Sequence, residues 1–172
     1  MKRILITGMS GTGKSTVVRE LQARGYRAVD TDYDGWSRWV DMRTNQPAPP
    51  PAAGEDRWDE LDWAWDEERM LDLLTHAESD VLFVAGTSPN QRAFYPHFDL
   101  IILLSAPVSV LTKRLTERTN NPYGTTPRSL HRVLEHVATV EPLLRKRADY
   151  EIDTDAPLDE VVERVLQLIY NS

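Results

Sequence analysis

A glycine-rich segment near the N-terminus has the residue types and the spacing that bind phosphate. Residues 8–15 read Gly-Met-Ser-Gly-Thr-Gly-Lys-Ser and match the pattern G-x-x-x-x-G-K-S. Glycines let the backbone curl so that successive N–H groups point at phosphate oxygens, and a helix that begins near Lys14 directs its positive end at the same anion. The lysine of this pattern reaches the β and γ phosphates, and the hydroxyl of Ser15 can ligate Mg²⁺. The predicted nucleotide site comprises Gly8, Ser10, Gly11, Thr12, Gly13, Lys14, Ser15 and Thr16.

Two arginines further along the chain could act on the same phosphates. Arg114 and Arg118 are four residues apart, so on a helix both project from one face, and a polar loop over residues 119–126 follows them. Phosphoryl transfer spreads negative charge over equatorial oxygens, and a guanidinium that arrives with a closing loop stabilises that charge. The alternative is a solvated basic face that also includes Lys113.

Three acids, Asp30, Asp32 and Asp34, follow a short apolar run. Carboxylates repel phosphate and can accept the proton of a hydroxyl group, so these residues favour a hydroxyl-bearing acceptor. The alternative for Asp30 and Asp32 is that they cap a neighbouring helix. A phosphate acceptor would instead require converging arginines. Those available are Arg38, Arg43, Arg69 and Arg92.

Short apolar runs that alternate with helical patterns must position these groups. This order predicts βαβ units and a parallel sheet. The predicted strands are residues 3–7, 26–30, 81–85, 100–104 and 150–152. Helical spacing predicts a helix after the glycine-rich segment, one that starts at Thr126-Pro127 and is interrupted near Pro142, and a last one over residues 158–169. We expect the proline-rich stretch 45–56 to be a mobile loop.

The composition limits the function classes. A chain of 172 residues has the size of one domain, and it contains no cysteine, which excludes disulfides and thiolate metal sites. The net charge of −7 argues against nucleic-acid or anionic-membrane partners. The apolar run behind Met1 is too short for a signal-peptide core, and we expect a cytoplasmic protein.

Two other classes of phosphate-loop protein fit less well. Guanine-nucleotide switches carry an N/T-K-x-D motif, which this sequence lacks. Mechanical and AAA-type ATPases usually have an apolar strand that ends in Asp-Glu, whereas the third and fourth predicted strands are followed by Gly86-Thr87 and Ser105-Ala106.

The chain resembles the nucleoside-monophosphate-kinase-like P-loop kinases, especially the branch around shikimate kinase and gluconate kinase. Four features that span almost the whole chain carry the resemblance. They are the glycine-rich segment, Asp30-Thr31-Asp32 as a D-x-D motif, Arg114 and Arg118 with the polar loop through Gly124, and residues 152–157. The resemblance implies an α/β fold, a P-loop NTPase three-layer αβα sandwich with a five-stranded parallel sheet. It also implies one kinase domain over residues 1–172, with a substrate-binding insert at about 33–79 and a lid at about 119–127.

The same resemblance implies individual roles. Arg114 would stack on the adenine, and Pro157 would cover its other face in a loop that includes Asp155. Asp30 would help to hold the water shell of the magnesium ion that Ser15 ligates. The expected catalytic residues are Lys14, Asp32, which would face the acceptor, and Arg118, which would meet the transferring phosphate.

The acceptor half of the chain departs from this branch. Shikimate kinases carry an F-R-x-x-E stretch whose arginine holds the substrate carboxylate, and here residues 65–69 read Trp-Asp-Glu-Glu-Arg. Asp66 in the arginine position would repel shikimate, so we expect a different acceptor. The three-glycine turn of the branch is here Ala85-Gly86-Thr87, and its lid arginine-proline pair is replaced within residues 121–124.

All five tryptophans lie between the D-x-D motif and the third predicted strand. They could sandwich a planar or sugar-like acceptor, or they could pin the insert onto the sheet. The turn over residues 88–92 should face the acceptor, because ligands bind at the carboxyl ends of parallel strands, although it could be a plain surface turn. The residues that we expect at the acceptor are Asp32, Trp36, Trp65, Arg69, Gly86, Asn90 and Gln91.

We therefore expect a kinase that uses ATP and Mg²⁺ to phosphorylate a small hydroxyl-bearing acceptor, as a monomer or homodimer. One alternative is a nucleoside or nucleotide monophosphate kinase. Another is a regulatory nucleotide-binding ATPase with low hydrolysis. Strong stimulation of ADP release by one metabolite would separate the kinases from the regulatory protein.

Overall fold

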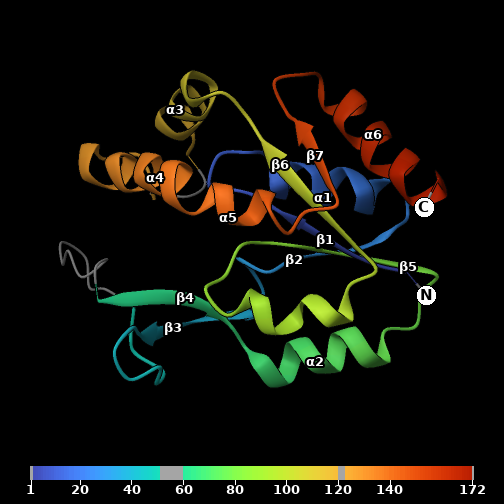
Figure 1. Cartoon of the computed structure of the whole chain (residues 1–172), viewed down its shortest axis with the longest axis horizontal. Helices are drawn as coiled ribbons and strands as arrows, with labels where there is room; N and C mark the ends of the chain where they lie inside the picture. The colour runs from blue at the N-terminus through green and yellow to red at the C-terminus, as the bar shows by residue number, and fades with distance from the viewer. Residues whose placement is uncertain (1, 51–59, 120–122, 172) are drawn as a thin grey trace.

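A sheet of five parallel strands lies at the centre of the computed structural model, which describes residues 2–50, 60–119 and 123–171 (Figure 1). The strand order is β2-β5-β1-β6-β7. The strands are β1 Lys2–Thr7, β2 Arg27–Asp30, β5 Val81–Ala85, β6 Leu100–Ser105 and β7 Tyr150–Asp153. The prediction of a five-stranded parallel sheet in an α/β fold is confirmed, and each predicted apolar run forms one of these strands.

Helices cover both faces of the sheet (Figure 1). They are α1 Lys14–Ala23, α2 Glu67–His76, the 3₁₀ helix η1 Gln91–His97, α3 Val108–Glu117, α4 Pro127–Thr139, α5 Glu141–Arg145 and α6 Leu158–Asn171. Helix α4 begins with a capping box, in which Thr126 and Ser129 satisfy each other's backbone N–H groups, and it ends just before Pro142 as expected. None of these helices, within the described part of the chain, is long and apolar enough to cross a membrane.

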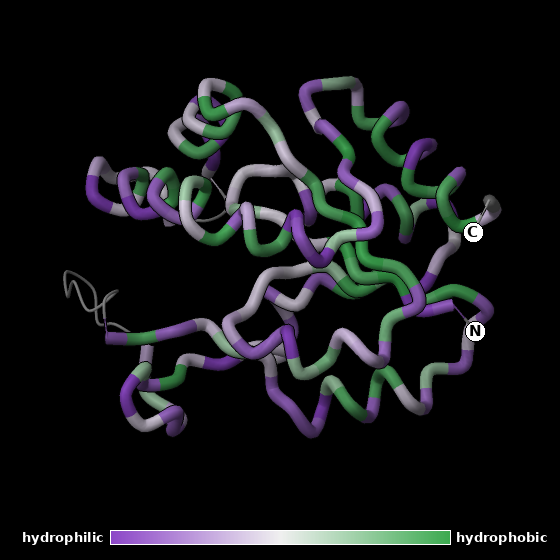
Figure 2. Tube along the Cα trace, viewed as in Figure 1, coloured by the Kyte–Doolittle hydropathy of each residue, from purple (hydrophilic) through white to green (hydrophobic). Residues whose placement is uncertain are grey.

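The strands are buried on both faces, so their side chains divide between two apolar clusters. Ile4 and Ile6 of β1 pack with α1 and α6, whereas Leu5 packs with α2 and η1. All three side chains are fully buried. The hydrophobic stretches accordingly gather in the central strands (Figure 2). This rigid sheet holds the loops at the carboxyl ends of its strands.

An antiparallel hairpin, which the sequence analysis did not predict, stands beside the sheet. It consists of β3 Ser37–Asp41 and β4 Leu61–Trp65, with Trp39 directly opposite Trp63. The two indole rings lie 4.9 Å apart between centroids, a distance at which aromatic cross-strand pairs stabilise a hairpin. Parts of the predicted proline-rich loop and of the predicted lid lie outside the described residues. Trp58 lies outside them as well.

Candidate active site

The glycine-rich segment forms a tight loop between β1 and α1. Gly8 has a φ of 152°, and a Cβ atom there would lie 2.3 Å from the carbonyl oxygen of Leu104, so only glycine fits against β6. Gly13 caps α1 in a left-handed conformation, and α1 begins at Lys14. The loop therefore presents its backbone and the positive end of α1 to the same space, as phosphate binding requires.

Lys14 folds back over this loop. Its Nζ donates hydrogen bonds to the carbonyl oxygens of Gly8, at 2.6 Å, and Met9, at 3.1 Å. Burial lowers the pKa of Lys14, while the carboxylates of Asp32 and Asp30 oppose that shift. The lysine thus lies between the phosphate loop and the two acids.

The D-x-D motif stands at the carboxyl end of β2, and its two acids differ in their surroundings. Asp30 accepts a hydrogen bond from the backbone of Asp32 through one oxygen, whereas its Oδ2 is buried and has no partner among the described residues. Asp32 faces a cavity, where burial by the surrounding protein raises its pKa; the charge of Lys14 opposes this shift. An aspartate with a raised pKa beside a lysine can act as a general base.

Thr31, between the two acids, anchors the motif to the core. Its hydroxyl donates to the carbonyl oxygen of Ala85 and accepts the indole N–H of Trp65 at 2.9 Å. Gly86 is required here, because a Cβ atom at that position would lie 1.9 Å from Thr31 Oγ1. The core side chains thus fix the direction in which Asp30 and Asp32 point.

The two predicted arginines both reach the phosphate loop, by different routes. Arg118 Nη1 donates to Ser10 Oγ at 3.3 Å, and its Nε and Nη2 are buried without partners among the described residues. Arg114 donates to the carbonyl oxygen and hydroxyl of Thr154, and more weakly to the carbonyl oxygen of Gly11. Helix α3 ends at Glu117, and Arg118 has an extended backbone with a ψ of 146°. The prediction that both arginines project from one helix face is therefore wrong.

The predicted adenine loop follows β7. Asp155 donates its backbone N–H to Asp153 Oδ1, and Pro157 precedes α6. Thr154, which binds Arg114, is the neighbour of Asp155, so Arg114 joins this loop to the phosphate loop. Asp155, Pro157 and Arg114 do not line the cavity described next, and their contacts with a base stay a prediction.

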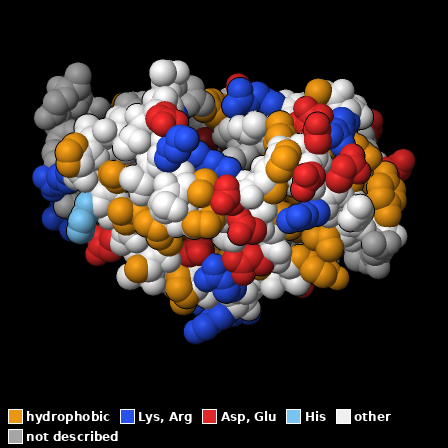
Figure 3. Space-filling view, turned by 90° about the horizontal axis from the view of Figure 1, so that it is seen from above, with side chains coloured by type: hydrophobic (Ala, Val, Ile, Leu, Met, Phe, Trp, Pro, Cys, Tyr) orange, Lys and Arg blue, Asp and Glu red, His pale blue; other side chains and the backbone are white. Residues whose placement is uncertain are grey.

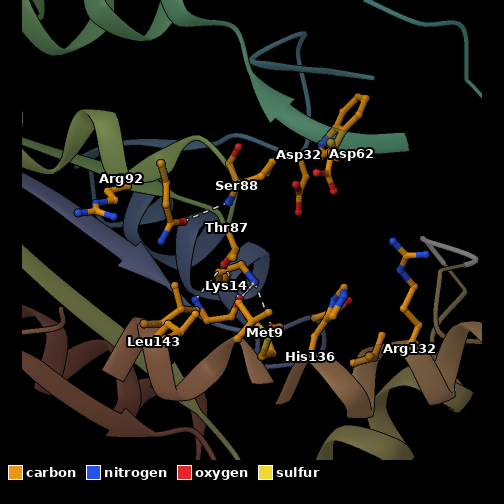
Figure 4. Close-up of a pocket in the computed structure, with 18 of the residues that line it drawn as sticks. Met9, Lys14, Asp32, Asp62, Thr87, Ser88, Arg92, Arg132, His136 and Leu143 are labelled. Carbon is orange, nitrogen blue, oxygen red and sulfur yellow. Dashed lines mark hydrogen bonds between the residues drawn. The ribbon is translucent and has the colours of Figure 1, made fainter. Parts of the chain in front are cut away.

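One cavity of about 880 Å³ opens between the phosphate loop, the hairpin and helices α4 and α5 (Figure 4). Of the predicted site residues, Gly8, Ser10, Lys14, Asp32 and Gln91 line it. The turn over residues 88–92, which was expected to face the acceptor, also contributes Ser88, Pro89 and Arg92. Side chains that the sequence analysis did not select complete the wall. They are Met9, Trp39, Leu61, Asp62, Trp63, Thr87, Tyr95, Tyr123, Arg132, Val133, His136, Val140, Leu143, Leu144, Lys146 and Arg147.

The structure does not place five predicted acceptor residues on this wall. Trp65 is 1% exposed and belongs to the core, where it bonds Thr31. Asn90 binds the backbone N–H and carbonyl of Trp65, so it fastens the hairpin to the turn after β5. Arg69 stacks on Trp36 at 4.1 Å and donates to the carbonyl oxygen of Asp34. Gly86 also lies off the wall, where its lack of a side chain makes room for Thr31. These five residues therefore pack the elements around the site and do not line the cavity.

Two other tryptophans take the position that was expected of Trp36 and Trp65. Trp39 and Trp63 line the cavity as a pair, and a hydrogen-bonding interaction with Trp63 lowers the pKa of Asp32, although burial outweighs it. No local signal separates these tryptophans, because the alternation of a strand puts Trp63, which lines the cavity, on the same side as Trp65, which is buried in the core. Trp39 and Trp63 therefore line the cavity, whereas Trp36 and Trp65 pack outside it, and the contact of a tryptophan with an acceptor stays a prediction.

Asp66 does not act as the sequence analysis expected. It caps helix α2 by accepting the backbone N–H of Arg69, and it pairs with Arg38 at 3.1 Å. Asp66 does not line the cavity. The reason given for a mismatch with shikimate, repulsion by this acid, therefore has no support in the structure.

Comparisons with known proteins identify the family of the chain. Residues 4–135 match the family described as AAA domain. The chain belongs to this family. The curated relatives include shikimate kinase 2 of Yersinia enterocolitica, 29% identical over 96% of this chain and 94% of the relative, and that of Yersinia pestis, 30% identical over the same shares. Within the family, the chain belongs to the shikimate kinase and gluconate kinase branch of P-loop kinases, as the sequence resemblance predicted.

Solved structures of this branch share the fold. Shikimate kinase from Acinetobacter baumannii, in complex with shikimate, superposes with a TM-score of 0.64 at 20% identity, over 99% of this chain and 94% of that one. A gluconokinase from Sinorhizobium meliloti gives a TM-score of 0.54 at 20% identity, over 98% and 95%. The family description names the AAA domain, but the strands that precede Gly86 and Ala106 lack the acidic pair expected of mechanical ATPases.

Proposed function

We propose that this protein is an ATP-dependent kinase that transfers the γ-phosphate of ATP to a hydroxyl group of a small metabolite. One observation carries the proposal: a single cavity contains both Lys14 of the phosphate loop and Asp32 of the D-x-D motif. Their charges interact, as the opposing effects on their pKa values indicate. A cation for phosphate and a base for a hydroxyl proton are the two groups that this transfer needs.

Mg²⁺ fits the residues at the phosphate loop. The unpartnered Oδ2 of Asp30 is a buried acceptor that a metal-bound water could satisfy, and Ser15 follows Lys14 at the start of α1. Ser15 and Asp30 are therefore the residues that would hold the ion. When bound, it supplies positive charge to the β and γ phosphates.

The side chains of the cavity supply the remaining chemistry. Asp32 would accept the proton of the acceptor hydroxyl. The hydroxyl oxygen would form a bond to the γ-phosphorus while the bond from that phosphorus to the β-γ bridging oxygen breaks, with ADP as the leaving group. Lys14 would leave the carbonyl oxygens of Gly8 and Met9 for the phosphates. The two free donors of Arg118 would bind the oxygens on which charge accumulates.

The proposal extends to the organisation of the chain. Residues 1–172 would act as one kinase domain, with residues 33–79 as the acceptor-binding insert and 119–127 as the lid. The cysteine-free composition supports a cytoplasmic location. On the face seen in Figure 3, acidic and basic side chains alternate without an extended basic patch, which supports a small-molecule partner over nucleic acid. The proposed assembly is a monomer or a homodimer.

A coupled assay of ADP release with a panel of metabolites tests this function. We expect one hydroxyl compound to stimulate turnover strongly above the rate without acceptor, and Lys14→Ala to abolish that stimulation. Nucleoside monophosphates in the same panel test the alternative acceptor class. Binding of Mg-ADP without stimulation by any compound would favour the regulatory ATPase.

A further inference from the structure

Two hydrogen bonds hold Lys14 against the phosphate loop. Its Nζ donates to the carbonyl oxygen of Gly8 at 2.6 Å and to that of Met9 at 3.1 Å. In the proposed complex the lysine reaches the β and γ phosphates, so both oxygens lose this donor. Gly8 is buried, and a buried carbonyl without a donor costs free energy comparable to a lost hydrogen bond. The affinity for phosphate therefore depends on what else binds these two oxygens.

Each of the two carbonyl oxygens has a second side-chain donor, and in both cases it is a threonine hydroxyl. Thr12 Oγ1 donates to the carbonyl oxygen of Met9 at 2.8 Å, and the backbone N–H of Thr12 adds a longer bond of 3.3 Å. Thr87 Oγ1 donates to the carbonyl oxygen of Gly8 at 2.7 Å. Thr87 comes from the turn after β5, and Figure 4 shows it beside Lys14. Once Lys14 leaves, Thr87 is the remaining donor to Gly8 among the described residues.

The hydroxyl group of Thr87 is fixed in this direction, because its other hydrogen-bonding positions are occupied. Its oxygen accepts the backbone N–H of Gly8 at 3.2 Å and lies 3.1 Å from Oγ1 of Thr7, a fully buried side chain. A hydroxyl has one proton and two lone pairs. Since Thr87 gives its proton to Gly8, Thr7 is the donor in the pair of threonines. With the proton and both lone pairs engaged, the hydroxyl has no freedom to turn away from Gly8.

The turn that carries Thr87 is held by further hydrogen bonds. Gln91 Oε1 accepts the backbone N–H of Ser88 at 3.1 Å, and Gln91 Nε2 donates to the hydroxyl of Tyr95 at 2.8 Å. Gln91 and Ser88 are both buried. These bonds do not involve Lys14, so the turn keeps its shape whether the lysine lies on the loop or on a nucleotide.

We infer that Thr87 is a positioning residue of the phosphate loop: its hydroxyl keeps the carbonyl oxygen of Gly8 hydrogen-bonded when Lys14 moves from that oxygen to the phosphates of a nucleotide. This inference rests on the proposed kinase function and adds to its nucleotide site a residue outside the glycine-rich segment. The hydroxyl favours the nucleotide-bound state, because in the free state Lys14 already binds the same oxygen. Residues 85–87 stand in the place of a three-glycine turn, and glycine has no hydroxyl, so such a turn could not supply this bond.

The affinity of the full chain for Mg-ADP, measured by calorimetry, tests the inference. Thr87→Val keeps the branched shape and removes the hydroxyl, so the dissociation constant should rise about tenfold, equivalent to about 1.4 kcal/mol, because a buried oxygen loses its last donor. Thr87→Ser keeps a hydroxyl and should restore the wild-type affinity. The matched control is Thr75→Val, which removes a hydroxyl that donates to the carbonyl oxygen of Leu71 within α2, outside the cavity. It should bind Mg-ADP as the wild-type chain does.

The same substitution in a chain without the lysine shows whether Thr87 acts through Lys14. In Lys14→Ala no lysine leaves the oxygen of Gly8 on binding, so Thr87→Val removes the same hydrogen bond from the free and the bound state. The tenfold effect should therefore disappear in Lys14→Ala/Thr87→Val, measured at millimolar Mg-ADP against Lys14→Ala alone. An equal loss of affinity in both backgrounds would mean that the hydroxyl acts on the fold in general, and the inference would be wrong.

The remaining outcomes are also decisive. Wild-type affinity in Thr87→Val, or failure of Thr87→Ser to restore binding, would overturn the inference and leave the kinase function intact. If Thr87→Val does not fold, Thr87→Ala removes the same hydroxyl and replaces it in both backgrounds. Binding of Mg-ADP without transfer to any acceptor would count against the kinase function alone, since the inference is judged by binding. A wild-type chain that does not bind Mg-ADP would refute both.

Discussion

The phosphate side and the acceptor side of the cavity are built by different means. On the phosphate side, residues 8–16 are contiguous, and backbone geometry with one lysine makes the site. On the acceptor side, a hairpin, the turn after β5 and the segment after α5 each contribute a few side chains. The contiguous site depends on a motif, whereas the assembled site depends on how distant elements pack. A family can therefore keep the first and change the second.

The two sides meet at Asp32, so its substitution should have the largest effect. Asp32→Asn keeps the shape and removes the charge, and we expect transfer to fall by roughly 10²–10⁴-fold because the hydroxyl proton loses its acceptor. Mg-ADP affinity should persist. Turnover with the identified acceptor and equilibrium binding of Mg-ADP measure the two effects. Near-normal transfer would indicate that the acceptor is a phosphate group.

The two arginines at the phosphate loop should separate turnover from nucleotide binding. Arg118→Ala should lower kcat by about 10²-fold, because its free donors would meet charge that develops in the transition state. Arg114→Ala should instead weaken Mg-ADP binding by about 0.5–2 kcal/mol, through loss of a stacking contact. Steady-state kinetics and calorimetry distinguish these results. Unchanged turnover in Arg118→Ala would contradict its assignment.

Nucleotide binding tests the phosphate side alone. Mg-ADP at about 100 times its dissociation constant should stabilise the fold by roughly 2.7 kcal/mol, which shifts the melting temperature by about 5–10 °C. Lys14→Ala should remove most of this shift, since the lysine reaches the phosphates. A thermal scan with no shift in the wild-type chain would refute the nucleotide site.

Substitution of single tryptophans tests the acceptor side alone. Trp63→Ala should raise the acceptor KM by about tenfold, because Trp63 lines the cavity and contacts Asp32. Trp36→Ala is the matched control, since it removes an indole that stacks on Arg69 outside the cavity. Its main effect should be a loss of stability of about 1–3 kcal/mol with little change in KM. Equal KM values in the two variants would show that the hairpin stabilises the fold without contacting the acceptor.

The smallest expected effect is a dependence of stability on pH. Burial raises the pKa of Asp32 in the folded chain above the unfolded value of about 3.9, so ionised Asp32 destabilises the fold at neutral pH. Asp32→Asn should therefore be more stable than wild type at pH 7. The difference should shrink as the pH falls through the raised pKa, where wild-type Asp32 becomes protonated. Urea unfolding at several pH values measures this trend, and a difference that grows toward acid would contradict it.

Local chemistry in the sequence determined the phosphate side and the sheet. The glycine-rich loop was predictable because its function needs particular residue types at fixed spacing, as the close approach of Gly8 to Leu104 illustrates. The five strands were predictable because strands buried on both faces must be apolar almost throughout. Asp32 and Arg118 could be selected because they match the D-x-D motif and the lid arginines of the kinases that the sequence resembles, and because ligands bind at the carboxyl ends of parallel strands.

Beyond Asp32 and the turn over residues 88–92, which the sequence indicated, the tertiary structure decided the acceptor side. Pairing of Trp39 with Trp63 depends on register between strands about twenty residues apart, and register sets which tryptophans face the cavity and which enter the core. The sequence predicts that Asp66 faces the acceptor, whereas in the structure Asp66 is the N-cap of α2. Arg92 and Arg147 line the same cavity only because η1 and the segment after α5 both border it. Such contacts join distant residues, and no local spacing encodes them.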